Sequence, residues 1–346
     1  MKIILDAMGG DNAPQAPVMG AVEAVKTWGS QITLVGRGEE ILRVLRENGI
    51  ADLPNGLEIA NADDVVDMHD DPAAVIHKRK NSSMVVGLKM LSDGNGDAFI
   101  SAGSTGALLT GATLLVKRGK GIRRAAMGPA MPNKAGGKTI IVDCGANAEC
   151  TPEFLLQFGV VGSLHAKKSF GVENPRVGLL NIGTEDSKGT PLQKEAYALL
   201  KDASEKGILN FIGNVEGRDV LLGGVDVVVC DGFSGNVLLK SIEGTAYFMG
   251  SLMKHKIFKR NVLSMIGYLF CKKGVDEVMK MMDYREIGGT QFLGIKKPVI
   301  KAHGSSDALA FRNAVRQAEA AVKANNADEL AQELQQLSEA KETSHD

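Results

Sequence analysis

The stretch KIILDAMGGDNAP, residues Lys2–Pro14, decides the fold of this chain. Its apolar run KIILD is short and continuous, which is typical of a β-strand covered on both faces. A Gly-rich turn follows at once. Beyond it, Val18, Val22 and Val25 repeat at helical spacing up to Gly29, a residue that favours a helix C-cap. The chain is therefore predicted to begin as a strand, a Gly-rich turn and a helix.

The same unit recurs along most of the chain. Short runs rich in Val and Ile predict further strands at ITLVG, DAFIS, KTIIVD, RVGLLNI, LNFIGN, DVVVCD and PVIKA. Segments of helical period lie between them, such as EEILRVLRENG, in which Ile41, Leu42 and Leu45 form an apolar stripe. This alternation predicts a doubly wound α/β/α sandwich, and we expect a single α/β domain over residues 1–346.

The residues that follow the strands point to a ligand. Six strands end in turns that combine Gly with Asn, Asp, Ser or Thr, namely AMGGDNAP, AGSTGA, CGANAE, GTEDSKG, GNVEGRD and GFSGN. In an open parallel sheet the carboxyl ends of the strands share one edge, where Gly lets backbone N–H groups approach an anion. Ordinary turn and capping preferences explain any single turn of this kind. Six together favour a shared site for a polar ligand such as phosphate.

Composition excludes several classes of protein. The chain has 346 residues, 44% of them apolar, and a formal net charge of −1, so its overall charge does not attract nucleic acid. The start MKIILDAMGGD does not fit a signal peptide, and no stretch reaches the roughly 18 apolar residues of a membrane span. The four cysteines lack metal-binding or redox spacing, so we expect reduced thiols and a cytoplasmic protein.

The sequence also lacks the motifs of other enzyme classes. GGKT at residues 136–139 is not a P-loop, because Pro132 stands where the first Gly is needed. GKGIRR at residues 119–124 lacks the last Gly of a dinucleotide-binding fingerprint. There is no nucleophile elbow, HExxH motif or zinc spacing. A phosphate crevice without these groups predicts that phosphate itself reacts, with no metal ion and no cofactor.

Eight motifs in series resemble those of the PlsX-type phosphate acyltransferases of bacterial phospholipid synthesis. They are DAMGGDNAP, NSSM, SAGSTGALL, DCGANAE, LLNIGTEDSKG, FIGNVEGRD, DGFSGN and KAHGSSDALAF, and they span residues 1 to about 320. The resemblance implies transfer of a fatty acyl group from acyl carrier protein to inorganic phosphate. The resulting acyl phosphate would go to a membrane glycerol-3-phosphate acyltransferase. It also implies a homodimer and a fold similar to those of phosphotransacetylases and isopropylmalate-type dehydrogenases.

Three residues are predicted to carry the chemistry. Lys188, in GTEDSKG, is a mobile cation suited to phosphate, although an ordinary surface lysine is the alternative. Asn236, in DGFSGN, either donates an amide hydrogen to the oxyanion or phosphate, or caps the following helix, a role that Ser234 could take instead. His303, in KAHGSSD, is a candidate general acid towards the leaving thiolate.

Other residues of the same turns are predicted to build the phosphate site. Gly9 and Gly10 allow close approach of the backbone, whereas Asp6 and Asp11 cannot hold phosphate directly and are expected to orient cations or water. The hydroxyl and amide groups predicted to contact the substrate are those of Ser101, Ser104, Thr105, Asn147, Ser234, Ser305 and Ser306.

The segment SLMKHKIFKRNVLSMIGYLFCKKGVDEVMKMMD breaks the α/β alternation, and residues of about 245–285 are predicted to protrude as helices. One interpretation is a helical pair in a dimer interface. The other is a surface for the acyl chain, the acyl carrier protein or a membrane, with peripheral contact through Lys254–Lys273. Residues from about 320 to 346 are rich in Ala, Glu and Gln and predict a solvated helical tail.

Two other functions remain open from the sequence. A nicotinamide-dependent hydroxyacid dehydrogenase on a similar scaffold needs an adenine site and usually a carboxylate–metal cluster, and the sequence offers neither. A non-catalytic phosphate- or acyl-binding regulator would bind the same ligands without turnover. Phosphate-dependent release of thiol from acyl carrier protein separates both from acyl transfer.

Overall fold

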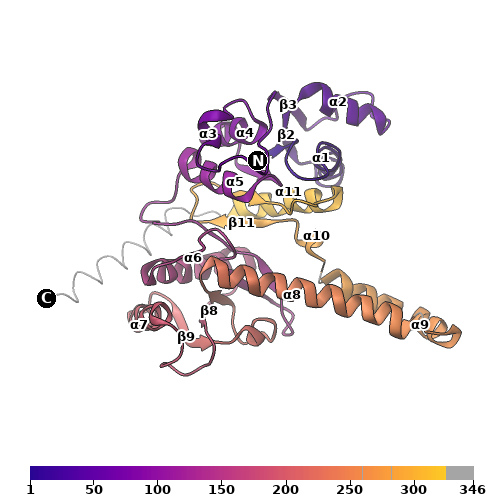
Figure 1. Ribbon diagram of the computed structural model, residues 1–346. Coiled ribbons are helices and arrows are strands. Elements are labelled where there is room, and N and C mark those ends of the chain that lie inside the picture. The colour runs from indigo at the N-terminus through magenta and orange to yellow at the C-terminus, as the bar shows by residue number, and fades with distance from the viewer. Residues whose placement is uncertain (259, 282, 325–346) are drawn as a thin grey trace.

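Two β-sheets, each covered by helices, form the framework of the protein in a computed structural model (Figure 1). The structure describes residues 1–258, 260–281 and 283–324. The first sheet lies in the upper part of Figure 1 with the amino-terminal helices, and the second sheet lies below it. A long helical hairpin extends sideways from the lower part.

The first sheet has seven strands in the order β3–β2–β1–β4–β12–β11–β5. Its first five strands in that order run parallel, whereas β11 is antiparallel to both of its neighbours. The strands are β1 (Lys2–Asp6), β2 (Gln31–Gly36), β3 (Leu57–Asn61), β4 (Ala98–Ser101), β5 (Ala126–Met127), β11 (Thr290–Leu293) and β12 (Val299–Lys301).

The second sheet has five strands in the order β6–β7–β10–β8–β9. Only β6 is antiparallel to its neighbour, so the other four strands present their carboxyl ends on one side. The strands are β6 (Ala130–Pro132), β7 (Lys138–Val142), β8 (Arg176–Leu180), β9 (Asn210–Val215) and β10 (Val227–Val229).

Helices cover both faces of each sheet, as the doubly wound prediction requires. On the first sheet, α1, α2 and α11 pack on one face, and α4 and α5 pack on the other. On the second, α6 and α7 cover one face and the start of α8 covers the other. The helices are α1 (Gln15–Trp28), α2 (Gly38–Glu47), α3 (Val75–Lys78), α4 (Ser83–Ser92), α5 (Thr105–Gly111), α6 (Pro152–Phe170), α7 (Pro191–Glu205), α8 (Gly232–Leu252), α9 (Val262–Met281), α10 (Tyr284–Ile287) and α11 (Ala308–Ala324).

The strands named from the sequence are all present, and Gly29 ends α1 in the left-handed conformation with φ of 69°. The arrangement of the turns differs from the prediction in one respect. The six Gly-rich turns were expected on one sheet edge, but two follow strands of the first sheet and four follow strands of the second. The reason is that residues 126–132 carry the chain from β5 in one sheet to β6 in the other.

Met127 joins the two sheets at this crossing. Within β5 it pairs with Phe292 of the first sheet. Its N–H donates to Oδ1 of Asp143, which follows β7, at 2.8 Å, and its carbonyl accepts from the N–H of Cys144 at 3.1 Å. Both main-chain groups of one residue therefore bond to the second sheet while the residue belongs to the first.

The hairpin of α8 and α9 leaves the body of the protein (Figure 1), and α8 begins at Gly232, ahead of the segment of about 245–285 that was predicted to protrude. The rings of Phe258 and Tyr268 lie 4.7 Å apart between centroids near its tip. Among the described helices, none has the length and hydrophobicity needed to cross a membrane. The predicted tail to residue 346 lies outside the described residues, apart from the end of α11 at Ala324.

Candidate active site

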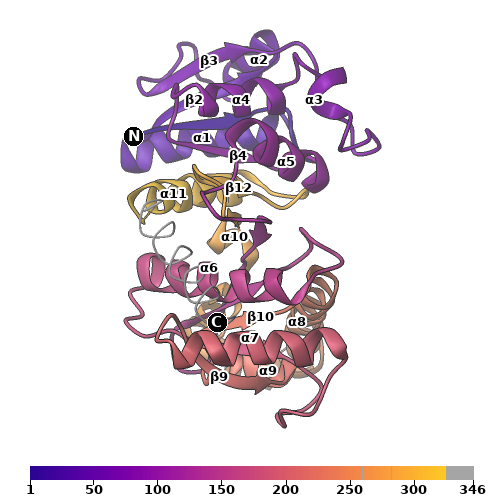
Figure 2. The ribbon, with the colours of Figure 1, turned by 90° about the vertical axis from the view of Figure 1, so that its left-hand side faces the viewer.

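A cleft of about 450 Å³ lies between the two sheets. Residues after β4 and β12 line it from the first sheet, and β6, the turn after β7 and α8 line it from the second. Figure 2 shows β12 and α10 in the middle of the molecule, between the upper and lower helices. Polar groups from both sheets therefore face one cavity.

The parallel register brings the ends of three strands together in the first wall. Ser101 of β4 pairs with Lys301 of β12, and β1 lies on the other side of β4. The Ser101 hydroxyl donates to Oδ2 of Asp6 at 2.7 Å and accepts from the N–H of Gly103 at 3.0 Å. Burial raises the pKa of Asp6, and hydrogen bonds from the side chains of Ser83 and Ser101 and from the N–H of Met8 oppose that shift. Asp6 and Ser101 are buried and are used to build the wall.

Gly9 and Gly10 are required by packing within this wall. A Cβ on Gly9 would lie 2.6 Å from Oδ2 of Asp6 and 2.8 Å from the nitrogen of Gly103. A Cβ on Gly10 would lie 2.8 Å from that of Ala102, and its φ of 99° is in the left-handed region. Both glycines let the first turn approach the turn after β4, which explains them without a bound phosphate.

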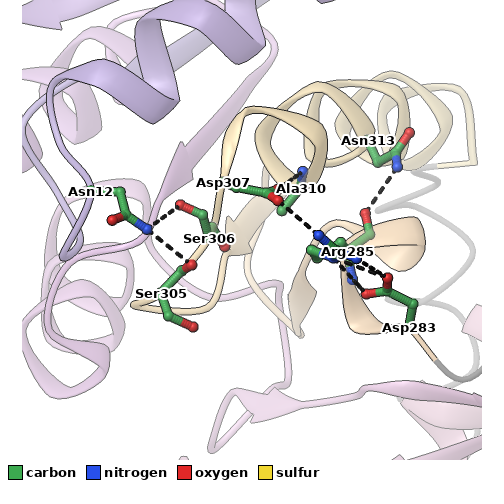
Figure 3. Close-up of polar contacts among 8 residues, drawn as sticks. All are labelled: Asn12, Asp283, Arg285, Ser305, Ser306, Asp307, Ala310 and Asn313. Carbon is green, nitrogen blue, oxygen red and sulfur yellow. Dashed lines mark hydrogen bonds and ion pairs between the residues drawn. The ribbon is translucent and has the colours of Figure 1, made fainter. Parts of the chain in front are cut away.

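The first turn also holds the last turn of the sheet, as Figure 3 shows for Asn12. The Asn12 amide donates to the carbonyl oxygens of Ser305 and Ser306 at 3.1 and 3.2 Å. The Asp11 N–H donates to the carbonyl of Gly304 at 2.8 Å. The first turn therefore fixes the backbone of the 303–306 turn through Asp11, which the sequence placed in the phosphate site, and through Asn12, to which it gave no role.

Within that turn, His303 is the predicted side chain that lines the cleft. Its Nδ1 lies 2.8 Å from Oγ of Ser305. Burial lowers the pKa of His303, and the charge of Lys240 adds to the shift. A neutral imidazole is a weaker proton source, which argues against the general-acid role. Ser306 is buried, and its hydroxyl has no hydrogen-bond partner among the described residues.

Thr105 lines the cleft at the start of α5, together with Gly103. Ser104, next to it, is the N-cap of that helix, and its hydroxyl accepts from the N–H of Ala107 at 3.5 Å. Of the three residues with hydroxyl groups predicted here, Ser101 and Ser104 use theirs in the local structure, and Thr105 lines the cleft.

Lys301 is a cleft residue that the sequence analysis missed. Its Nζ donates to the carbonyl oxygens of Ala102, at 3.3 Å, and Ala302. Burial lowers the pKa of Lys301 to about 8, and the charges of Asp11 and Asp6 oppose the shift. The signal was a single lysine within the apolar run PVIKA, at the carboxyl end of a parallel strand, where ligands bind.

The second wall is built around Asp143. Its Oδ1 accepts from the N–H groups of Met127 and Ala146, at 2.8 and 3.2 Å. Its Oδ2 accepts from the N–H of Asn147 at 2.6 Å and from the amide of the same residue at 3.0 Å. Burial raises the pKa of Asp143, and these bonds oppose the shift. The Asn147 amide, which also donates to the carbonyl of Ala125, is thus engaged within the wall.

The start of α8 lies directly on this wall and presents Asn236 to the cleft. A Cβ on Gly235 would lie 1.9 Å from the carbonyl oxygen of Asp143, so only glycine allows this approach. Asp231 caps the helix, because its carboxylate accepts from the N–H and the hydroxyl of Ser234, both at 2.8 Å. The expectation that Asn236 or Ser234 caps this helix is therefore wrong, and Ser234 is held by the cap.

Most of the remaining lining is apolar. It includes Met68, Met127, Met131, Leu239, Met281 and Ile287. Lys240 also lines the cleft and pairs with Glu243 at 2.7 Å.

Burial raises the pKa of the Cys144 thiol well above its usual value, so this cleft residue is a poor nucleophile at neutral pH. The described residues include no group of three or more His, Cys, Asp or Glu suited to a metal ion.

Lys188 lies in the turn after β8 and is not among the residues that line the cleft. Its Nζ is 3.9 Å from Oε1 of Glu185, and its side chain is 47% exposed. An exposed pair of this kind contributes little to stability. The structure thus brings Thr105, Asn236 and His303 to one cavity with Lys301, and the role of Lys188 stays a prediction.

The fold is that of an α/β enzyme of the phosphotransacetylase type. The phosphotransacetylase from Streptococcus pyogenes matches with a TM-score of 0.60 at 19% identity, covering 95% of this chain and 94% of that chain. The 4-hydroxythreonine-4-phosphate dehydrogenase from Klebsiella pneumoniae matches with a TM-score of 0.55 at 12% identity, covering 93% and 99%. Because transferases and dehydrogenases share this fold, the fold alone does not choose between them.

Sequence similarity gives the family. A family model described as "Fatty acid synthesis protein" matches residues 1–329. The phosphate acyltransferase of Thermoanaerobacterium thermosaccharolyticum is 44% identical over 335 residues, which are 97% of each chain. This chain belongs to that fatty acid synthesis protein family. The resemblance recognised in the eight motifs is confirmed.

Proposed function

We propose that this chain is a phosphate acyltransferase that moves a fatty acyl group from acyl carrier protein to inorganic phosphate. The observation that carries the proposal is the cleft, in which a half-buried cation and an amide share one cavity with a methionine-rich lining. Such a cavity suits a phosphate and an acyl chain together. Relatives along nearly the whole chain are named phosphate acyltransferase, which supports the same activity.

The reaction joins a phosphate oxygen to the thioester carbonyl carbon. As that C–O bond forms, the carbonyl oxygen gains charge; the C–S bond then breaks and the carrier protein leaves as a thiolate. The Asn236 amide is placed to donate a hydrogen bond to the oxyanion. A thiol with a pKa of about 8.5 leaves without an acid, so a neutral His303 is compatible with turnover.

The apolar lining is proposed to hold the acyl chain. Met131 and Met281 are unbranched and flexible, so they adapt to chains of different length. Lys188 is proposed to attract phosphate from the turn after β8. No metal ion and no cofactor is required by this scheme.

Thiol release from fatty acyl carrier protein, followed at increasing phosphate concentration, tests the proposal. Release should saturate with phosphate, and hydroxylamine should trap one acyl phosphate for each thiol released. Sulfate at the same ionic strength is the control and should give no release. Thiol release that does not need phosphate would contradict the proposal. Tight binding without any turnover would instead indicate a non-catalytic regulator, and hydride transfer to a nicotinamide would indicate a dehydrogenase.

The hairpin is proposed to serve either assembly or delivery, in a protein that works in the cytoplasm as a homodimer. Its exposed apolar side chains include Tyr247, Phe248, Val262, Leu263, Ile266, Leu269 and Phe270. We propose that Lys254–Lys273 makes peripheral contact with anionic lipid, because apolar burial adds to the attraction of lysines for such a surface. Contact there would bring the acyl phosphate to a membrane glycerol-3-phosphate acyltransferase.

Sedimentation with anionic vesicles tests the membrane contact. Wild-type protein should sediment with the vesicles at low salt and be released at high salt, because each lysine contributes about 1 kcal/mol near such a surface. Replacing Ile266 and Leu269, which are 47% and 69% exposed, with Glu should abolish sedimentation and leave thiol release intact. If the replacement splits a dimer and stops turnover, the hairpin is an interface between two copies and the membrane contact is wrong.

A further inference from the structure

The surroundings of Lys301 leave its charge without a counter-ion. Its Nζ donates to two main-chain carbonyl oxygens, those of Ala102 and Ala302. An ammonium group has three hydrogens, so one donor remains for another acceptor. No carboxylate of a described residue forms an ion pair with this Nζ.

A lysine near the opposite, amino end of β12 provides a comparison. Lys297, four residues earlier, also donates only to carbonyl oxygens, those of Leu91 at 2.8 Å and Gly96 at 3.2 Å. It does not line the cleft, whereas Lys301 does. The two residues therefore share a bonding pattern, and only Lys301 is placed to meet a ligand.

The charged groups around Lys301 do not neutralise it. Asp6 is engaged by the Ser101 hydroxyl and the N–H of Met8. On the facing helix, Lys240 is paired with Glu243 at 2.7 Å, so this pair brings little net charge to the cleft. Asp11, in the first turn, acts on Lys301 through its charge without forming an ion pair.

A cation removed from water is costly unless an anion or several acceptors compensate for it. Burial lowers the pKa of Lys301 to about 8, in the direction that this cost predicts. A dianion in the cleft would supply the missing acceptor and the opposite charge together, and would hold the lysine protonated.

We propose that Lys301 is the residue that binds the inorganic phosphate inside the cleft, next to His303 and Gly304. This inference rests on the proposed function and adds a residue to it. The lysine binds the phosphate before and during the attack on the thioester, and it forms no covalent bond.

Phosphate kinetics of Lys301→Gln, with Lys297→Gln as the matched control, test the proposal. Loss of a charged hydrogen bond should raise KM for phosphate by about 30-fold in Lys301→Gln. The control should stay within about twofold of wild type. KM for the acyl carrier protein should not change in either variant. An unchanged KM for phosphate in Lys301→Gln overturns the inference, while phosphate-dependent thiol release in the wild type would still support the proposed function.

Dependence on pH gives a second, independent readout. As pH rises through about 8, Lys301 loses its proton, so wild-type KM for phosphate should rise about tenfold per pH unit above that value. Lys301→Arg stays charged and should keep a flat profile over the same range. If the arginine variant retains the wild-type slope, another group titrates and the inference is wrong.

Phosphate-dependent thermal stabilisation covers the case in which the glutamine variant is poorly active. Inorganic phosphate should raise the Tm of the wild type and of Lys297→Gln, because it binds only the folded state. It should leave the Tm of Lys301→Gln unchanged. Equal stabilisation of all three proteins by phosphate, but not by chloride at the same ionic strength, places the phosphate elsewhere and overturns the inference.

Discussion

Each wall of the cleft is supported by a buried aspartate, but the hydrogen-bond donors to the two aspartates differ. In each wall a buried aspartate, Asp6 or Asp143, stands at the carboxyl end of a strand and accepts hydrogen bonds from its own turn and from another strand. Among the described residues, the Asp143 carboxylate accepts from N–H groups of the backbone and of a side-chain amide. The donors to Asp6 include a hydroxyl, that of Ser101.

This difference in donors makes the second wall more rigid than the first. An N–H group can only donate, whereas a hydroxyl can rotate and accept. The second wall is thus fixed in one arrangement, which suits the oxyanion contact proposed for Asn236. The first wall carries Lys301 and His303, which line the cleft.

Truncation of the oxyanion donor should give the largest effect. Asn236→Ala should lower kcat by about 10²- to 10³-fold, as loss of one oxyanion donor does, and leave the Tm nearly unchanged because Asp231 caps the helix.

Lys188→Ala should lower turnover by about 10²-fold, also with little effect on stability. Steady-state kinetics and thermal melts check both. Near wild-type turnover in both variants would place the chemistry elsewhere.

Replacing each aspartate with asparagine should have a smaller effect, and the loss of stability should differ between the two walls. In Asp143→Asn the new NH₂ must face an N–H donor, so the free energy of unfolding should fall by about 1–3 kcal/mol. In Asp6→Asn the Ser101 hydroxyl can rotate to accept, so the loss should be under about 1 kcal/mol. Denaturant unfolding measures both values. Equal losses would show that the hydroxyl gives the first wall no tolerance.

A similarly small effect is expected for the ion-pair cluster behind the first wall (Figure 3). The Arg285 guanidinium bonds to Asp283 at 2.6 Å and to Asp307 at 3.1 Å, and its side chain is 43% exposed. Arg285→Met should therefore cost only about 1 kcal/mol at neutral pH.

The same cluster makes this cost depend on pH. Hydrogen bonding to Arg285 holds the pKa of Asp283 below its ordinary value of 3.8. A lowered pKa in the folded state stabilises the protein above 3.8, and this contribution is lost as pH falls through the folded pKa. Urea unfolding of both proteins at several pH values should show the difference shrinking in acid. A constant difference would mean that packing, and not the ion pair, explains the loss.

The sequence predicts the strands that are buried on both faces and misses those that pairing creates. Runs such as KIILD and DVVVCD are apolar throughout, so local composition identifies them. β5 has two residues and β6 has three, and they exist because the chain pairs on its way from one sheet to the other. No local pattern marks such strands, which is why the division into two sheets was not predicted.

Prediction of the site residues from the sequence is limited in the same way, because local pattern does not show which groups meet across the fold. The residue types expected at strand ends are present, but Ser101, Ser104 and Asn147 bond within the walls. A hydroxyl that caps a helix and one that meets a ligand look alike in a sequence. Lys301 was missed for the opposite reason, since its neighbours in PVIKA indicate a buried strand and not a cleft.

Met127 has a consequence for how the protein unfolds. Its two main-chain groups bond to Asp143 and Cys144 of the second sheet, and its strand pairs with Phe292 of the first. Neither sheet can lose its edge there without exposing polar groups of the other, which couples their opening. We therefore expect calorimetry to record one cooperative transition for both sheets, with the amides of Met127 and Cys144 among the slowest to exchange with solvent.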